Sequence, residues 1–343
     1  MKSHLSPTRE RGFTLPELLV AMVITTVVTG GALAALQQAN QAAEIGSVRT
    51  DLNQNLRVAM NMVIKDLLQA GEGTRTGISI PSGVGSQPIP RPGPEGADWD
   101  FDHEFTVLPA VAPGDDIGTV VNDVSTDVIS VMFEDHRLDL NPGGIPLPVV
   151  AVDGSSVTFN AAVDVSNAVD GIKVGDLIRF GSDGAMQEVT SVSGQTAYFN
   201  ATCPSNLNQR TAPAGSVMEK SASFGGLDMH RIYLVSYYIY IPSTGAVTSP
   251  HLIRRLGWGT GRVVATGLEN MQLTFDLVDG VTNPTNQNDF TGENEEGQIR
   301  KANLFMAARS FSFFSRTNQY QRTSLSTQVS LRSMAFVSNY NLQ

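Results

Sequence analysis

The carboxylate of Glu17 is the most unusual chemical group in this sequence, because it is the only ionisable side chain in the apolar run of residues 13–36. A carboxylate near one end of a membrane helix costs several kcal/mol at most depths, so it usually has a partner. A free α-amine on Phe13 of a neighbouring chain would neutralise that charge. The sequence therefore predicts a partner for Glu17, and such an amine exists only if each chain is cut before Phe13.

The bond between Gly12 and Phe13 is the candidate for that cut. Residues 1–12 are polar and carry three Lys and Arg residues against one acidic residue, which keeps them in the cytoplasm. The apolar run behind them is long enough to span a bilayer, which takes about 20 residues at about 1.5 Å each. Signal peptidase cuts behind such a run, whereas here the boundary in front of it has its own glycine. Glycine leaves extended backbone unobstructed for a protease.

Residues 11–22, RGFTLPELLVAM, resemble the processing and methylation site of type IV prepilins and of type II secretion pseudopilins. The resemblance implies that a prepilin peptidase cuts after Gly12 and methylates the new amine of Phe13. It also implies that Glu17 is the family's glutamate at the fifth mature position. Within the family, the chain is most similar to minor pilins of the PilW type, with the J class of pseudopilins second.

This resemblance implies a structural subunit rather than an enzyme, and it implies no cofactor. The expected partners are other pilin subunits, the prepilin peptidase, the inner-membrane assembly platform and membrane lipid. We expect one pass through the inner membrane, with the carboxyl-terminal domain outside the cytoplasm, and later a place in a pilus at the cell surface. A chain of this size suits an initiating or tip-proximal minor pilin of a type IV pilus, and a type II secretion pseudopilin is the alternative.

Other interpretations of the same residues stay open. An ordinary signal anchor would place Glu17 at the level of the lipid headgroups, and a secretory signal peptide would be removed altogether. A function of another class is an adhesive or ligand-binding module carried on a pilin helix, with residues 134–225 as the binding surface. A membrane-anchored periplasmic enzyme is the remaining class.

Residues that could support catalysis are scattered through the sequence. No Gly-x-Ser-x-Gly pentapeptide occurs, so the nucleophile elbow of α/β-hydrolases is absent. His103 and His136 have acidic neighbours but no paired spacing for a metal, and Cys203 has no nearby histidine. Residues 257–261 are glycine-rich but lack the Lys-Ser/Thr pair of a phosphate loop. We expect solvated side chains and a turn here, not an active site and not a metal centre.

The richest polar tract lies at residues 276–296. Calcium binding is one interpretation, because hard cations prefer several oxygen ligands, but the twelve-residue calcium loop signature is absent. A solvated loop or a polar contact between subunits is the interpretation that we favour. The acidic and amide residues in question are Asp276, Asp279, Asn286, Asp289, Glu293, Glu295 and Glu296.

Composition excludes several classes of protein. The chain has 343 residues, of which 41% are hydrophobic, so it can bury a sizeable core. Its formal net charge is −10, from 23 Lys and Arg against 33 Asp and Glu, which opposes the phosphate-neutralising surface of nucleic-acid binders. No direct nucleic-acid partner is expected. A single cysteine excludes an intrachain disulfide.

A single long helix must carry Glu17 and connect it to the rest of the chain. Beyond the apolar run the pattern turns amphipathic, which predicts one helix from about Leu15 to Ala70. Residues 13–36 form its transmembrane half, and residues 37–70 form an amphipathic half that packs on a sheet. A coiled-coil stalk is the alternative, but the apolar stripe lasts barely three heptads. The stripe consists of Ile45, Val48, Leu52, Leu56, Ala59, Val63 and Leu67.

The remaining sequence predicts an α+β fold, in which the long helix packs on an antiparallel β-sheet that carries a β-rich insert. Residues 71–133 are expected to form a loop and the first strand, because Gly, Pro and Ser dominate their first half. Residues 134–225 are expected to form the insert from short hairpins, and residues 226–343 the antiparallel sheet of a pilin-like domain. The strands of that main sheet are expected at residues 232–241, 252–256, 271–278, 299–315 and 325–331.

Overall fold

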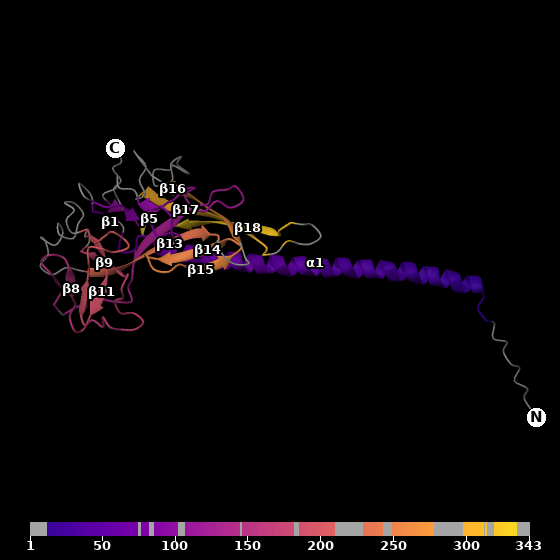
Figure 1. The fold of residues 1–343 in the computed structure, drawn as a ribbon, viewed down its shortest axis with the longest axis horizontal. Helices are drawn as coiled ribbons and strands as arrows, with labels where there is room; N and C mark the ends of the chain where they lie inside the picture. Colours follow the sequence, from indigo (N-terminus) through magenta and orange to yellow (C-terminus); the bar gives the residue numbers. More distant parts are fainter. Residues whose placement is uncertain are drawn as a thin grey trace, which may run out of the picture. The chain divides into compact units, whose positions relative to one another are not determined.

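The computed structural model describes residues 12–74, 77–81, 86–101, 107–144, 146–181, 185–209, 229–242, 249–277, 298–311, 313 and 319–334. The chain divides into two compact units, Met1–Asp51 and Leu52–Gln343. Helix α1 (Leu15–Gln69) contributes to both units, and the described strands belong to the second (Figure 1). The expected α+β class, with one long amino-terminal helix and antiparallel sheets, is confirmed.

Helix α1 is continuous over 55 residues, as the sequence predicts. Pro16 lies in its first turn, where a missing N–H interrupts no intrahelical bond, and the next proline in the chain is Pro81. The helix ends ahead of Gly71, whose φ of +80° is a left-handed conformation that favours glycine. The Gly71 N–H donates to the Met132 carbonyl at 2.9 Å and so ties the end of the helix to a strand.

A seven-stranded antiparallel sheet is built around the long strand β13. One edge of β13 pairs with β6, and the other edge pairs first with β9 and then with β14. Strand β5 extends the sheet beyond β6, β10 extends it beyond β9, and β15 extends it beyond β14. The strands are β5 (Val111–Ala112), β6 (Ile129–Glu134), β9 (Leu177–Phe180), β10 (Met186–Glu188), β13 (Met229–Tyr240), β14 (His251–Leu256) and β15 (Arg262–Thr266).

A separate three-stranded antiparallel sheet contains β16 (Leu268–Leu277), β17 (Ile299–Arg309) and β18 (Arg322–Ser330). The sequence predicts one main sheet from these strands together with β13 and β14, and the structure divides them into two. The division falls at Gly267, between β15 and β16, where φ is +77° and a Cβ would lie 2.6 Å from the Arg309 carbonyl oxygen. Only glycine fits this corner without strain, so it lets the chain leave one sheet and enter the next.

Four short strands between β6 and β13 form a further antiparallel sheet in the order β11-β12-β8-β7. Strands β9 and β10 come from the same stretch of sequence but join the central sheet, so residues 134–225 contribute to two sheets. The boundaries of an insert at 134 and 225 stay a prediction, since residues 210–228 lie outside the described residues. The four strands are β7 (Val149–Val150), β8 (Ser156–Thr158), β11 (Ser191–Ser193) and β12 (Thr196–Tyr198).

Residues 71–133, expected to be a loop and a first strand, contain two small sheets besides β5 and the start of β6. Strand β1 (Ile78–Ser79) pairs with β4 (Val107–Leu108), and β2 (Ile89–Pro90) pairs with β3 (Asp100–Phe101). Each of these strands has two residues. Their buried side chains at Ile78, Ile89, Phe101 and Leu108 belong to one apolar cluster with residues of the central sheet, such as Met132 and Leu234.

The carboxyl-terminal part of α1 packs on this domain through the later residues of the predicted apolar stripe, whereas Ile45 and Val48, the first two residues of that stripe, are only half-buried. Its side chains at Leu52, Leu56, Ala59, Met60, Val63 and Leu67 are buried. Asp66 is also buried on this face, and its Oδ2 accepts hydrogen bonds from the Tyr237 hydroxyl at 2.6 Å and from Arg254 Nε at 2.7 Å. Charge-assisted bonds of this length fix the helix in register on β13 and β14.

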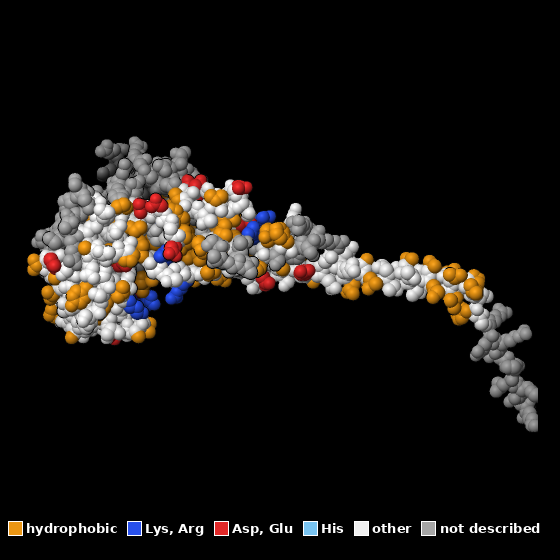
Figure 2. All heavy atoms as spheres, in the orientation of Figure 1, with side chains coloured by type: hydrophobic (Ala, Val, Ile, Leu, Met, Phe, Trp, Pro, Cys, Tyr) orange, Lys and Arg blue, Asp and Glu red, His pale blue; other side chains and the backbone are white. Residues whose placement is uncertain are grey.

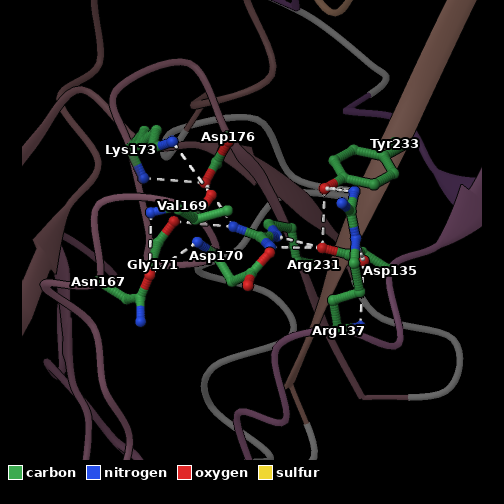
Figure 3. A network of polar contacts seen from close by, with 10 residues as sticks. All are labelled: Asp135, Arg137, Asn167, Val169, Asp170, Gly171, Lys173, Asp176, Arg231 and Tyr233. Atoms are coloured by element: carbon green, nitrogen blue, oxygen red, sulfur yellow. Dashed lines mark hydrogen bonds and ion pairs between the residues drawn. The ribbon is translucent and has the colours of Figure 1, made fainter.

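Arg231 on β13 connects the end of β6 with the loop that precedes β9 (Figure 3). Its buried guanidinium forms ion pairs with Asp135 and, at 3.3 Å, with Asp176. Burial acts to raise the pKa of Asp135, but hydrogen bonds from Arg137, Tyr233 and Arg231 outweigh it and hold that pKa below its ordinary value. Burial is the main cause that raises the pKa of Asp176. One cation thus compensates two carboxylates from distant parts of the chain.

Replacement of this cation should destabilise the domain far more than replacement of its exposed neighbour. Arg231→Ala removes the described ion pair of Asp176 and leaves Asp135 with only the exposed Arg137 as a cation, so the free energy of unfolding should fall by about 3–5 kcal/mol. Arg137 contacts the same Asp135 carboxylate at 3.3 Å, but its side chain is 66% exposed, so Arg137→Ala should cost less than about 1 kcal/mol. Denaturant unfolding of the detergent-solubilised chain, followed by tryptophan fluorescence, measures both losses. Equal losses would contradict this assignment.

Candidate functional site

Gly12 and Phe13, which flank the predicted cleavage bond, lie ahead of α1 in backbone without regular secondary structure. Phe13 is 88% exposed, and a Cβ at Gly12 would have no described atom within 4 Å. The described fold therefore does not require glycine at position 12. A requirement for glycine would come from a peptidase that needs the backbone unobstructed. The rest of the predicted leader, residues 1–11, lies outside the described residues.

Glu17 caps the start of α1. Its Oε2 accepts hydrogen bonds from the backbone N–H of Thr14 at 2.9 Å and from the Thr14 hydroxyl at 2.8 Å. Thr14 precedes the first helical residue, and Glu17 is the third residue of the helix, so the pair has the Thr-x-x-Glu spacing of a capping box. The Thr-x-x-Glu spacing is a local signal in the sequence for this capping role, which the predicted pairing between chains does not include. Glu17 thus has a local structural role besides the predicted pairing between chains.

The amino-terminal half of α1 presents apolar side chains to its surroundings. None of its side chains is buried, and by length and composition it is a candidate membrane span. Figure 2 shows apolar side chains along this part of the helix. Thr25 and Thr26 do not break the apolar character, because their hydroxyls donate to the carbonyls of Ala21 and Met22 at 2.7 and 2.8 Å.

Comparison with known proteins supports this interpretation of the amino terminus. Residues 7–33 match the family described as the prokaryotic N-terminal methylation motif. The match supports a type IV pilin-like or pseudopilin role and points to a structural subunit rather than an enzyme. It implies interaction with other pilin subunits and with a prepilin peptidase, and it is consistent with membrane anchoring. No curated protein and no solved structure matches the chain.

One group of carboxylates in the described residues is close enough to hold a cation. Ligand atoms of Asp115, Asp116 and Asp127 lie within 4.8 Å of one another. However, the two oxygens of the buried Asp127 already accept backbone N–H groups, from Asp116 at 3.0 Å and from Leu273 at 2.6 Å. Burial is the main cause that raises the pKa of Asp127 to about 6. These hydrogen bonds give the Asp127 carboxylate a structural role, because they connect its own loop to β16.

The other residues considered for chemistry have structural surroundings where they are described. Residues 257–261 form the turn between β14 and β15, as predicted. Cys203 is buried, with its sulfur 3.4 Å from the Ser205 hydroxyl. His136 is exposed, and its Nε2 lies 3.1 Å from Glu72. His103 and most of the polar tract considered for calcium, residues 278–297, lie outside the described residues.

Cleavage at the predicted bond should require glycine at position 12 but not at other open glycine positions near the amino terminus, such as Gly46. Gly12→Val should accumulate as uncut precursor, because the larger side chain blocks the peptidase while no described contact is disturbed. Gly46→Ala, at another position where a Cβ meets nothing within 4 Å, should be processed normally. Intact-mass analysis of membrane extracts should find wild-type chains that begin with N-methylated Phe13. A mature form that begins after Leu36 would contradict the prepilin-type site.

Proposed function

We propose that this chain is a minor pilin of the PilW type, a structural subunit of a type IV pilus that takes part in filament assembly or initiation. A prepilin peptidase cuts it after Gly12 and methylates Phe13, and the inner-membrane platform then moves it into the filament. The observation that carries the proposal is the exposed apolar half of α1, most of which lies within the methylation-motif match at residues 7–33.

The energetics of that half support two successive environments. Leu19, Val23 and Val27 are 56%, 60% and 69% exposed in the isolated chain, and burying such a side chain contributes about 1.5–3 kcal/mol. Membrane lipid covers these side chains after insertion. In a filament, the same half of neighbouring helices replaces the lipid. If these side chains were instead buried within the chain's own domain, neither lipid nor neighbouring helices would be needed to cover them.

Glu17 provides registration in this proposal. Its described hydrogen bonds use Oε2 and come from Thr14, next to the residue whose amine is freed by cleavage. Within a filament core, an unpaired carboxylate costs several kcal/mol, and pairing with the Phe13 amine of a neighbouring subunit removes that cost at one axial offset. The pairing therefore selects one arrangement of neighbouring helices and contributes little to the stability of a single chain.

The topology follows from the same features. The basic leader stays in the cytoplasm, α1 crosses the inner membrane once, and the sheet domain lies outside the cytoplasm. A 343-residue subunit suits a rare position at an initiating or tip-proximal site. If the chain were isolated together with short secretion filaments and not with pili, it would be assigned to the pseudopilins.

Loss of the Glu17 charge should reduce assembly without affecting the helix start. Glu17→Gln keeps a residue that completes a capping box, but it removes the charge that pairs with the neighbouring amine. We expect normal cleavage and a fall of about tenfold or more in the ratio of subunit in sheared filaments to subunit in membranes. The matched control is Glu44→Gln, which neutralises an exposed carboxylate on the same helix beyond the apolar run.

Two results would count against this account in different ways. An unchanged ratio for Glu17→Gln would refute the pairing mechanism and leave the structural-subunit role intact. Absence of the wild-type chain from sheared filaments, at an expression level where membranes contain it, would refute the pilus proposal itself.

A further inference from the structure

A pocket lies on the face of the central sheet that is turned away from α1. Tyr237 and Arg254 point to the helix, where both contact Asp66. Side chains alternate across a strand, so their neighbours Tyr238 and Ile253, which pair across β13 and β14, lie on the opposite face. They form part of the lining of a cavity of about 630 Å³, within the range of small-molecule sites.

Register extends the floor of this pocket over three strands. Tyr240 pairs with His251, and Ile253 pairs with Val263 of β15, and all of these residues line the cavity. Tyr238 is buried, whereas Tyr240 is 36% exposed and Val263 is 56% exposed. The floor therefore passes from a buried aromatic centre to an accessible aromatic rim.

Arg255 holds the two walls in place. Its Nε and Nη2 donate to the carbonyls of Gly259 and Trp258 at 2.7 and 3.1 Å, on the turn between β14 and β15. Its Nη1 donates to the carbonyl of Gly93, next to the opposite wall at Pro94. The Trp258 indole N–H is fixed separately by the Pro90 carbonyl at 2.9 Å. The walls are thus set before any ligand arrives, which lowers the cost of binding.

Polar groups in the lining indicate which ligand chemistry fits. Glu95 is an exposed carboxylate and Thr260 an exposed hydroxyl, so both can bond to a ligand. Arg255 donates to three backbone carbonyls and also bonds with the Tyr238 hydroxyl in the pocket floor, so it is not arranged as an anion receptor.

We propose that this pocket binds a neutral sugar ring, such as one hexose unit of a glycan. The apolar face of a pyranose can stack on Tyr240 and Trp258, and its hydroxyls can donate to Glu95 and exchange hydrogen bonds with Thr260. A proline-rich peptide fits the aromatic lining but has few N–H donors for the carboxylate. An organic cation fits Glu95 but would lie against the charge of Arg255. The inference does not rest on the role of the chain in a filament.

The test uses the full chain in a detergent without a sugar headgroup, with ligand binding measured by saturation-transfer NMR. The probes are the methyl glycosides of glucose, galactose, mannose and N-acetylglucosamine, together with decaproline and tetramethylammonium as the competing chemistries. We expect saturable binding of at least one glycoside. Tyr240→Ala should weaken that binding by about 2- to 10-fold, because it removes one stacking ring.

Matched variants separate this site from general surface effects. Tyr198 on β12 is 39% exposed, close to the 36% of Tyr240, but it is not part of the pocket, so Tyr198→Ala should bind as the wild type does. Glu95→Ala changes an exposed side chain and should also weaken binding. The proposal is overturned if no glycoside saturates, if decaproline or tetramethylammonium binds in place of the glycosides, or if Tyr198→Ala and Tyr240→Ala bind equally.

Discussion

The exposed apolar half of α1 sets the constraint on which the other features depend. Water solvates such a surface poorly, so the chain must keep it in lipid or against other proteins from synthesis onward. The single carboxylate in that half, Glu17, is compatible with this requirement because it caps the helix start through Thr14 and has a charge that a neighbouring amine can neutralise. The helix continues to Gln69 without a second proline, so the same element that contains the candidate membrane span also forms part of the domain core.

Within the domain, a few buried charges determine how the elements meet. Asp66 fixes the helix on β13 and β14, and Arg231 joins the end of β6 to the loop before β9. Strand β13 therefore carries contacts to the helix on one face, to partner strands along both edges, and to the aromatic pocket on the other face.

Features with a local sequence signal were predictable, and features that join distant residues were not. The stripe at Leu52, Leu56 and Val63 follows helical spacing, and the turn at 257–261 has its glycines. The capping pair of Thr14 and Glu17 also has a local signal, the Thr-x-x-Glu spacing. By contrast, no spacing connects Asp135 with Arg231, which are 96 positions apart. The division into two sheets depends on Gly267. Glycine is needed there because the Arg309 backbone approaches closely, and that contact exists only in the folded chain.

In the proposed filament role, the apolar half of α1 exchanges lipid for neighbouring pilin helices. Photocrosslinking from benzoylphenylalanine placed at Val23, an exposed position in that half, tests it most directly. A matched probe at Val152, which is 97% exposed on the sheet domain, controls for collisions at the protein surface. The account predicts lipid adducts from Val23 in membranes and adducts with pilin-type subunits from Val23 in sheared filaments. Filaments in which the Val23 probe forms no protein adduct, or no more than the Val152 probe, would contradict it.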